Sequence, residues 1–126
     1  MKKLIPYLII YEQCEKALEF YKECFEGQIT FQQRYYETKY DVSKEFKNKI
    51  AHAEFEADQI HFFVSDGFDG RKTNVGDNIA MSINFSDRLK QKEVFEKLKV
   101  GGQVTMDLTG TSANSTLATL SESIGI

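Results

Sequence analysis

The chain has 126 residues, of which 41% are hydrophobic and 28% charged, a composition typical of one globular domain. No apolar stretch approaches the roughly 20 residues of a membrane-spanning helix, so neither a membrane protein nor a membrane partner is expected. The net charge is −3 and the basic residues are scattered, which argues against nucleic acid as the main partner.

The N-terminal part has the pattern of a strand followed by a helix. The apolar run at 4–10 fits a buried strand, and residues 12–27 repeat apolar side chains at helical spacing. Gly27 stands where a glycine can end a helix. Cys14 and Cys24 share one face of this helix, about 15 Å apart along its axis, which is too far for a disulfide. We therefore expect two core thiols and a reducing, cytoplasmic location.

Residues 28–36 alternate as a strand does, and the alternation assigns their side chains to two faces. Ile29 and Phe31 are expected to face the helix. The alternate positions are expected to share the opposite, polar face: Thr30, Gln32, Arg34 and Tyr36. Residues 37–49 are charged and irregular, which indicates a loop with a helical turn. The aromatic residues in and before this loop are expected to form a cleft lip or a dimer contact: Tyr35, Tyr36, Tyr40 and Phe46.

Residues 50–66 hold both histidines of the chain and predict a β-hairpin around a two-residue turn, Asp58–Gln59. In this register an apolar set faces the helix: Ala53, Phe55, Ala57, Ile60, Phe62 and Val64. The opposite face pairs Glu56 with His61, Glu54 with Phe63, and His52 with Ser65. His52 and His61 then lie about 13 Å apart, too far to share one metal ion.

Glu56 and His61 are the catalytic candidates of this face. Their ordinary interpretation is a polar cross-strand contact worth about 0.2–1 kcal/mol. Their functional interpretation is a general base, an imidazole assisted by a carboxylate. If the face lines a cleft, the candidates for ligand binding are Arg34, Tyr36, His52, Glu54 and Phe63. Arg34 could hold an anion, although a solvated or ion-paired arginine is the more ordinary interpretation.

The second half of the chain repeats the order of the first. Its pattern predicts a linker at 67–77, a strand at 78–85, a helix at 88–100 and a strand from 103. Ser86 or Asp87 can cap the helix, and the pair Gly101–Gly102 can end it.

The two halves align at a constant offset of 75 residues, at which Gly27 meets Gly102 and Thr30 meets Thr105. Such a repeat predicts an α+β fold in which two βαβββ modules form one curved mixed sheet around a cleft. The first module is expected over 1–66 and the second over 78–126, within a single domain. The second is expected to be truncated, because the chain stops before its last strand. Whether this is a natural end or a truncation stays open.

Three motifs carry a family resemblance. The first consists of Pro6, Tyr7, Leu8, Cys14, Ala17, Leu18, Phe20, Tyr21, Phe25 and Gly27. The second consists of His52, Ala53, Phe55, Ser65 and Asp66, and the third of Gly101, Gly102, Val104 and Met106. In this order they resemble the PhnB-like branch of the vicinal oxygen chelate superfamily, which also contains glyoxalase I, bleomycin-resistance proteins and extradiol dioxygenases. The resemblance reaches to about residue 108; of the family's later Thr-Phe-Trp-Gly segment only Thr111 is present.

The resemblance implies the glyoxalase/bleomycin-resistance fold, a homodimer and a cleft for a small molecule, but no particular reaction. Metal-dependent members bind one ion through strand residues of both modules. At two of these ligand positions this chain has Pro6, or one of its neighbours, and Asn78. Only His61 could therefore match a ligand position of the superfamily. A catalytic site needs about three protein ligands, and no metal is therefore expected. A glycine-rich strand–turn–helix is not found either, so no cofactor is expected.

We therefore expect a cytoplasmic, dimeric PhnB-like protein of unassigned activity that binds a small molecule in its cleft without a metal. One alternative is a metal-dependent lyase, dioxygenase or thiol transferase of the same superfamily. Another is a non-catalytic, drug-sequestering resistance protein, whose acidic cleft would favour cationic ligands. Whether the protein is an enzyme stays open.

Overall fold

The computed structural model describes residues 1–76, 78–100, 102–112 and 115–122, with side chains described up to residue 100. The chain divides into two compact units, Met1–Asn74 and Val75–Ile126, with the boundary inside the predicted linker. Within the described residues, no helix is long and apolar enough to cross a membrane.

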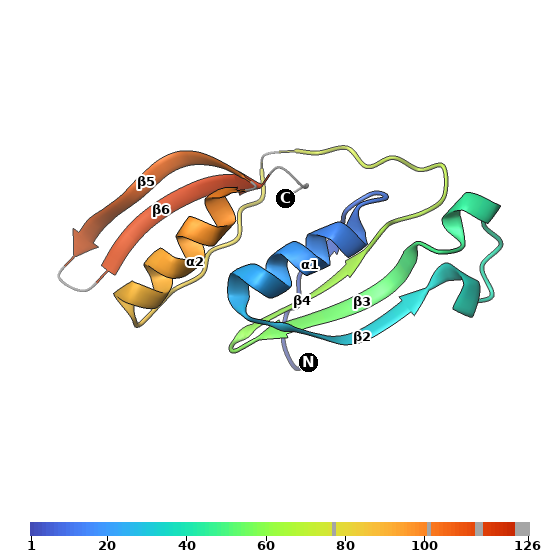
Figure 1. The fold of residues 1–126 in the computed structure, drawn as a ribbon, viewed down its shortest axis with the longest axis horizontal. Coiled ribbons are helices and arrows are strands. Elements are labelled where there is room, and N and C mark those ends of the chain that lie inside the picture. Colours follow the sequence, from blue (N-terminus) through green and yellow to red (C-terminus); the bar gives the residue numbers. More distant parts are fainter. Residues whose placement is uncertain (77, 101, 113–114, 123–126) are drawn as a thin grey trace. The chain divides into compact units, whose positions relative to one another are not determined.

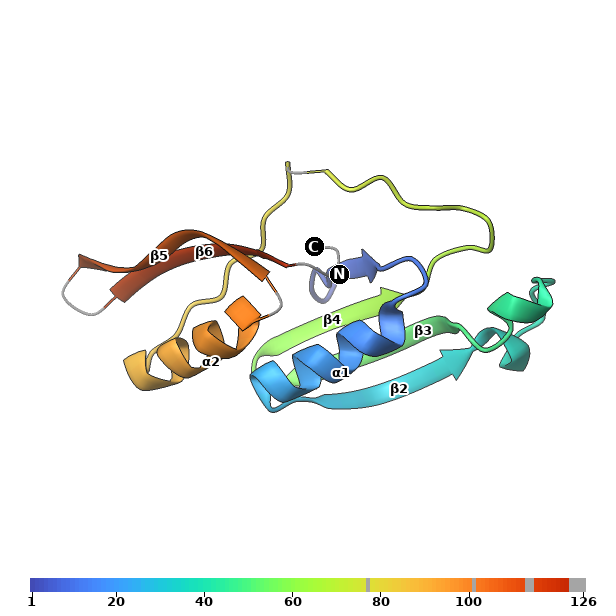
Figure 2. The same cartoon turned by 45° about the horizontal axis from the view of Figure 1, so that its top comes forward.

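The first unit is a four-stranded mixed sheet with one helix, in the order β-α-β-β-β. Its elements are β1 (Tyr7–Ile9), α1 (Cys14–Phe25), β2 (Gln28–Arg34), β3 (Ile50–Ala57) and β4 (Ile60–Ser65). The spatial order is β1-β4-β3-β2, in which β1 runs parallel to β4 and the other pairs are antiparallel. Helix α1 lies along one face of this sheet (Figures 1 and 2). The unit therefore has a covered face and a face that no helix of its own covers, called the open face below.

The core lies between α1 and the covered face. The apolar positions predicted for α1 are buried, apart from Phe25, which is partly exposed: Cys14, Ala17, Leu18, Tyr21 and Cys24. Both cysteines are free thiols, as predicted. The hairpin register is also confirmed from Ala53 opposite Val64 to Ala57 opposite Ile60, and Asp58 takes the left-handed conformation in the turn, with φ 53°. Phe55 and Phe62 stack with their ring centroids 4.7 Å apart.

Gly27 has a different role from the predicted one. Glu26, not Gly27, takes the left-handed conformation that ends α1, with φ 54°. A Cβ atom on Gly27 would overlap the ring of Phe55 and would lie 2.9 Å from the carbonyl oxygen of Glu56. The position therefore requires glycine because the helix end passes very close to β3.

The faces predicted for β2 are wrong beyond Ile29, because the strand contains irregularities. One register shift lies between Ile29 and Phe31, where the extra residue, Thr30, is on β2. Another lies between Gln33 and Arg34, where the extra residue is on β3, so it leaves the facing of β2 unchanged. A bulge inserts an extra residue and reverses the facing of the residues that follow. Phe31 thus pairs with Glu54 and contacts the ring of His52 on the open face, where the pattern placed it toward the helix.

Two single 3-10 turns follow β2. The first, η1 (Tyr35–Glu37), begins inside the stretch predicted as strand, whereas η2 (Lys44–Phe46) lies in the predicted loop and agrees with the expected helical turn. Tyr35 and Phe46 are buried with ring centroids 5.3 Å apart, so both belong to the core rather than to a cleft lip or a dimer contact. Tyr36 and Tyr40 are exposed.

The second unit contains α2 (Arg88–Val100), β5 (Gly102–Ser112) and β6 (Ser115–Glu122), and the two strands pair antiparallel. The helix has the predicted bounds, and the carboxylate of Asp87 caps it by accepting the amide of Leu89 at 2.9 Å. The predicted strand at 78–85 is wrong for its described residues, which form no strand. Apolar alternation favours a strand only where a neighbouring strand supplies hydrogen bonds. The described part of this unit thus has the order α-β-β, and the second complete βαβββ module is not present in it.

Candidate functional site

The candidate site lies on the open face of the first unit, where one row of residues crosses all four strands. Tyr7 of β1 lies beside Phe63 of β4, Phe63 opposite Glu54 of β3, and Glu54 opposite Phe31 of β2. His52 projects from the same face, two residues before Glu54 on β3. The parallel pairing of β1 with β4 thus brings Tyr7 to a histidine 45 positions later in the sequence.

Tyr7, His52 and Glu54 form a continuous hydrogen-bonded chain, called the Tyr–His–Glu chain below. The hydroxyl of Tyr7 lies 2.7 Å from Nδ1 of His52, and Nε2 of His52 lies 3.1 Å from Oε2 of Glu54. An ionised carboxylate can only accept hydrogen bonds, so Nε2 carries the proton. The tautomer of His52 with its proton on Nε2 offers the lone pair of Nδ1, and Tyr7 donates to it. The arrangement is that of an oriented base next to a hydroxyl group.

Aromatic rings surround His52 on three sides. Its ring centroid lies 5.0 Å from that of Phe63, 5.4 Å from that of Tyr7 and 5.8 Å from that of Phe31. Tyr7 and Phe31 are 48% and 46% exposed. The site therefore combines an accessible apolar surface with a few polar atoms in fixed positions, the combination typical of small-molecule sites.

The phenol of Tyr7 holds its proton firmly. Burial raises the pKa of Tyr7 above its ordinary value of 10.0, and the neighbouring groups Tyr35, Cys14 and Glu54 raise this pKa further. Tyr7 is thus a neutral hydrogen-bond donor at rest.

The predicted catalytic pair lies opposite each other in the sheet, as Glu56 and His61 are cross-strand partners. Among the described residues, however, no hydrogen bond or ion pair joins them. Nδ1 of His61 is buried and has no hydrogen-bond partner among the described residues. The ring of His61 contacts the ring of Phe63. The polar network of this face is therefore centred on His52, one of the predicted ligand-binding residues, and not on His61.

Of the other predicted ligand-binding residues, Glu54 and Phe63 lie beside His52 in the structure. Tyr36 and Arg34 lie away from it. Tyr36 lies in η1, beyond the end of β2, and is 60% exposed. Arg34 contacts α1 and therefore lies on the helix side, contrary to the predicted polar face. Sequence patterns missed Tyr7, because its strand pairs with β4, far away in the sequence.

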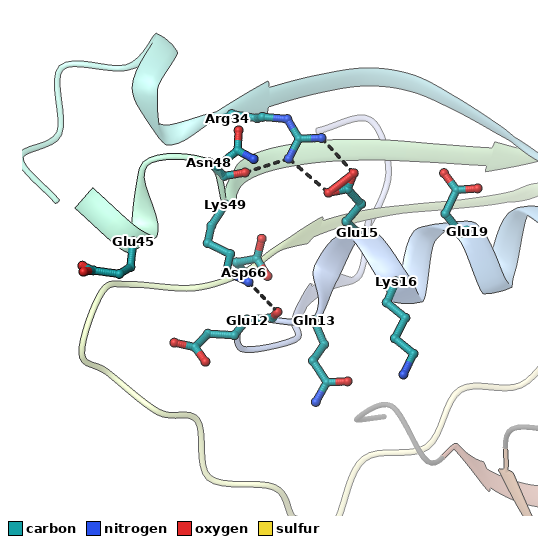
Figure 3. Close-up of a pocket in the computed structure, with 10 residues that line it drawn as sticks. All are labelled: Glu12, Gln13, Glu15, Lys16, Glu19, Arg34, Glu45, Asn48, Lys49 and Asp66. Carbon is teal, nitrogen blue, oxygen red and sulfur yellow. Dashed lines mark hydrogen bonds and ion pairs between the residues drawn. The ribbon is translucent and has the colours of Figure 1, made fainter. Parts of the chain in front are cut away.

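Arg34 lines a separate pocket of about 530 Å³ at the start of α1 (Figure 3). Its guanidinium donates to both carboxylate oxygens of Glu15, at 3.2 and 2.9 Å, and to the carbonyl oxygen of Asn48 at 2.7 Å. The hydrogen bond from Arg34 lowers the pKa of Glu15 below 4.5. Lys49 donates to the carbonyl of Glu12 at 3.0 Å. Of the three cationic side chains that line the pocket, two, Arg34 and Lys49, already have protein partners, and the open face is therefore the stronger candidate for a ligand site.

The residues present do not fit the metal site of the resembled superfamily. Among the described residues there is no group of three or more His, Cys, Asp and Glu side chains placed to hold a metal ion. On the open face, His52 uses both ring nitrogens in the Tyr–His–Glu chain. No step through a metal is derived from this arrangement.

Comparisons with known proteins agree on the family and the fold. Residues 2–117 match the model of the family described as 3-demethylubiquinone-9 3-methyltransferase. No curated protein matches the chain. The crystal structure of protein PA1353 from Pseudomonas aeruginosa is similar, with a TM-score of 0.86 at 21% identity over 100% of this chain and 93% of that one.

A PhnB protein from Bacillus cereus is also similar, with a TM-score of 0.77 at 20% identity over 99% of this chain and 95% of that one. Likeness at these identities shows the fold alone. Because the family match spans nearly the whole chain, the protein belongs to the family described as 3-demethylubiquinone-9 3-methyltransferase, with a small α+β fold similar to PhnB-like structures.

Proposed function

We propose that this protein binds a small molecule on the open face of its first unit, without a metal ion. The observation that carries the proposal is the Tyr–His–Glu chain set among accessible aromatic rings. The rings of Phe31 and Phe63 offer a surface for a planar apolar group, while Tyr7 offers a hydroxyl beside it. The resemblance to the vicinal oxygen chelate superfamily supports the same kind of ligand.

The charge of the open face favours neutral or cationic ligands. Glu54 and Glu56 both project from β3 on this side, whereas among the described residues of β1–β4 the basic side chains on this face are those of His52 and His61. Two carboxylates beside an apolar surface repel an anion and attract a cation. We therefore infer a neutral or positively charged aromatic compound as the ligand class.

The family description names a methyl transfer, and the described residues do not fit a site for a nucleotide-like methyl donor. Such cofactors use a glycine-rich turn between a strand and a helix. Here the turn between β1 and α1 consists of Ile10, Tyr11, Glu12 and Gln13, with no glycine. The carboxylate of Asp66 accepts the amide of Cys14 at 2.9 Å, so the first amide of α1 already has a partner. No methyl-transfer step is therefore derived.

Matched probes test the proposal directly. Benzylamine, benzyl alcohol and benzoate share one ring and differ in charge, so NMR titration of the protein with each separates the contribution of charge from that of the ring. We expect shifts at His52, Phe31 and Phe63, strongest with benzylamine and weakest with benzoate. Binding that leaves these residues unshifted, or the same shifts after His52→Ala, would contradict the proposal.

Titration with a divalent metal ion distinguishes the proposed metal-free function from the metal-dependent alternative. Calorimetric titration with Zn²⁺ should show no stoichiometric tight binding to the protein. Tight binding that is lost in His61→Ala would overturn the metal-free proposal, because His61 is the one residue that matches a ligand position of the superfamily.

We also propose that the protein is a homodimer. Sedimentation equilibrium should then give twice the mass of one chain, and a monomer at all concentrations would contradict this.

A further inference from the structure

We propose that the Tyr–His–Glu chain is a proton relay that removes a proton from the bound ligand and returns it, with the hydroxyl of Tyr7 as the reacting group. This inference rests on the proposed function, because the ligand must lie on the open face. It adds an activity, reversible proton transfer, and a substrate class, neutral aryl ketones with an acidic C–H next to the carbonyl.

The direction of the hydrogen bonds supports the relay. Glu54 accepts from Nε2 of His52 at 3.1 Å, which fixes the ring orientation and leaves the lone pair of Nδ1 toward Tyr7 at 2.7 Å. A carboxylate that orients an imidazole, which in turn faces a hydroxyl, is the arrangement that activates hydroxyl groups in unrelated enzymes. Within this chain only Tyr7 is about half exposed, since the side chains of His52 and Glu54 are 27% and 32% exposed.

The proton balance is closed within the site. The C–H bond of the ligand breaks and its proton passes to Oη of Tyr7, while the hydroxyl proton of Tyr7 passes to Nδ1 of His52. The electron pair of the C–H bond moves into the ligand carbonyl and forms an enolate. The resulting imidazolium lies between Tyr7 and the carboxylate of Glu54, which stabilises its charge. Reversal returns a proton to carbon and restores the chain, so no oxidant or reductant takes part.

The surroundings of the relay favour this substrate class. Phe31 and Phe63 lie on either side of Glu54 in the row that crosses the sheet, and a flat aryl group can stack on their rings. The other titratable groups identified on this face are Glu56 of β3 and His61 of β4. Glu54 and Glu56 repel a ligand that is already an anion, so a neutral ketone binds better than a carboxylic acid. The enolate forms together with the imidazolium of His52, whose positive charge offsets the negative charge of the enolate. Tyr7 keeps its proton at rest, because burial raises the pKa of its phenol.

Exchange of the ligand's C–H protons with deuterium from solvent tests the relay. Phenylacetone carries an aryl ring and exchangeable protons between the ring and the carbonyl. Its binding is followed by saturation-transfer NMR, and its exchange in D2O by loss of the proton signal. We expect the wild type to accelerate exchange over buffer, and Tyr7→Phe and His52→Gln to lose about 10²-fold or more of that acceleration while still binding. Glu54→Gln should lose about 10-fold, because it only orients His52.

Glu23→Gln is the matched control, since Glu23 is an exposed carboxylate on α1, away from the open face. It should exchange phenylacetone at the wild-type rate. Binding without accelerated exchange would overturn the relay and leave the proposed function standing, as would a Tyr7→Phe variant as fast as the wild type. Absence of phenylacetone binding to the wild type would overturn the relay, and absence of benzylamine binding as well would overturn the proposed function.

Discussion

The carboxylate of Asp66 joins three elements of the first unit, and its removal should be costly. It accepts the amide of Cys14, at the start of α1, at 2.9 Å and the amide of Ile50, at the start of β3, at 2.6 Å. Asp66 itself follows directly after β4 and is 2% exposed, and both donor residues are fully buried. The residue preceding α1, Gln13, makes no side-chain cap, so Asp66 caps the helix from a distance of 52 positions in the sequence.

Asp66→Ala leaves two buried N–H groups without an acceptor. Each such group costs about 1–3 kcal/mol, so we expect the free energy of unfolding to fall by about 2–5 kcal/mol. Asp66→Asn keeps one acceptor oxygen and places an NH2 group against the other amide, and it should cost less than Asp66→Ala. Equilibrium urea unfolding measures both, followed by NMR signals of Phe55 so that the first unit alone is observed.

Asp69→Ala is the matched control for this loss. Asp69 also accepts a backbone amide at 2.6 Å, from Ser43, but it is exposed, so water can replace it. We expect a cost of no more than about 1 kcal/mol. An Asp66→Ala variant that is destabilised no more than Asp69→Ala would refute the reasoning that burial makes the two hydrogen bonds of Asp66 important.

The pH dependence provides an independent check on Asp66. Burial raises its pKa above the ordinary 3.8, although the amides of Cys14 and Ile50 oppose the rise. A raised pKa means that the folded state holds this proton more tightly than the unfolded state does. The resulting contribution to stability is fully present below pH 3.8 and is lost as the pH rises through the folded pKa. Relative to Asp66→Asn, the wild type should therefore lose stability as the pH rises, and the opposite trend would contradict the assignment.

Three further predictions concern the rest of the described structure. Gly27→Ala should lower the free energy of unfolding by about 1–3 kcal/mol, because the added Cβ meets Phe55 and Glu56. The control Gly76→Ala, at negative φ in a loop, should change it by less than about 0.5 kcal/mol. Equal costs of the two substitutions in urea unfolding would contradict the steric argument. Arg34→Ala should return the lowered pKa of Glu15 toward 4.5 in an NMR titration, and an unchanged pKa would show that the ion pair does not form in solution. Amides of 78–85 should exchange with solvent faster than those of β3, and equal protection would indicate a strand there.

Much of the first unit could be predicted because its patterns are local. The helical spacing of apolar residues in 12–27 identified the buried face of α1, and strict alternation in the hairpin fixed which side chains of β3 and β4 face the core. The bounds of α2 and its capping by Asp87 followed from equally local signals. The strand predicted at 78–85 failed, because alternation does not reveal whether a partner strand is present.

The candidate site could be predicted only in part. His52, Glu54 and Phe63 were placed on one face from the hairpin alone, since residues two apart on a strand project to the same side. Tyr7 reaches them only because β1 pairs in parallel with β4, and Phe31 and Arg34 changed faces because β2 has an extra residue between Ile29 and Phe31. The sequence by itself thus determined the helices, the hairpin and their faces, which depend on neighbours a few residues away. Only the tertiary structure decided strand partners, bulges and the contact of Tyr7 with His52, because these depend on segments that meet after long stretches of chain have folded.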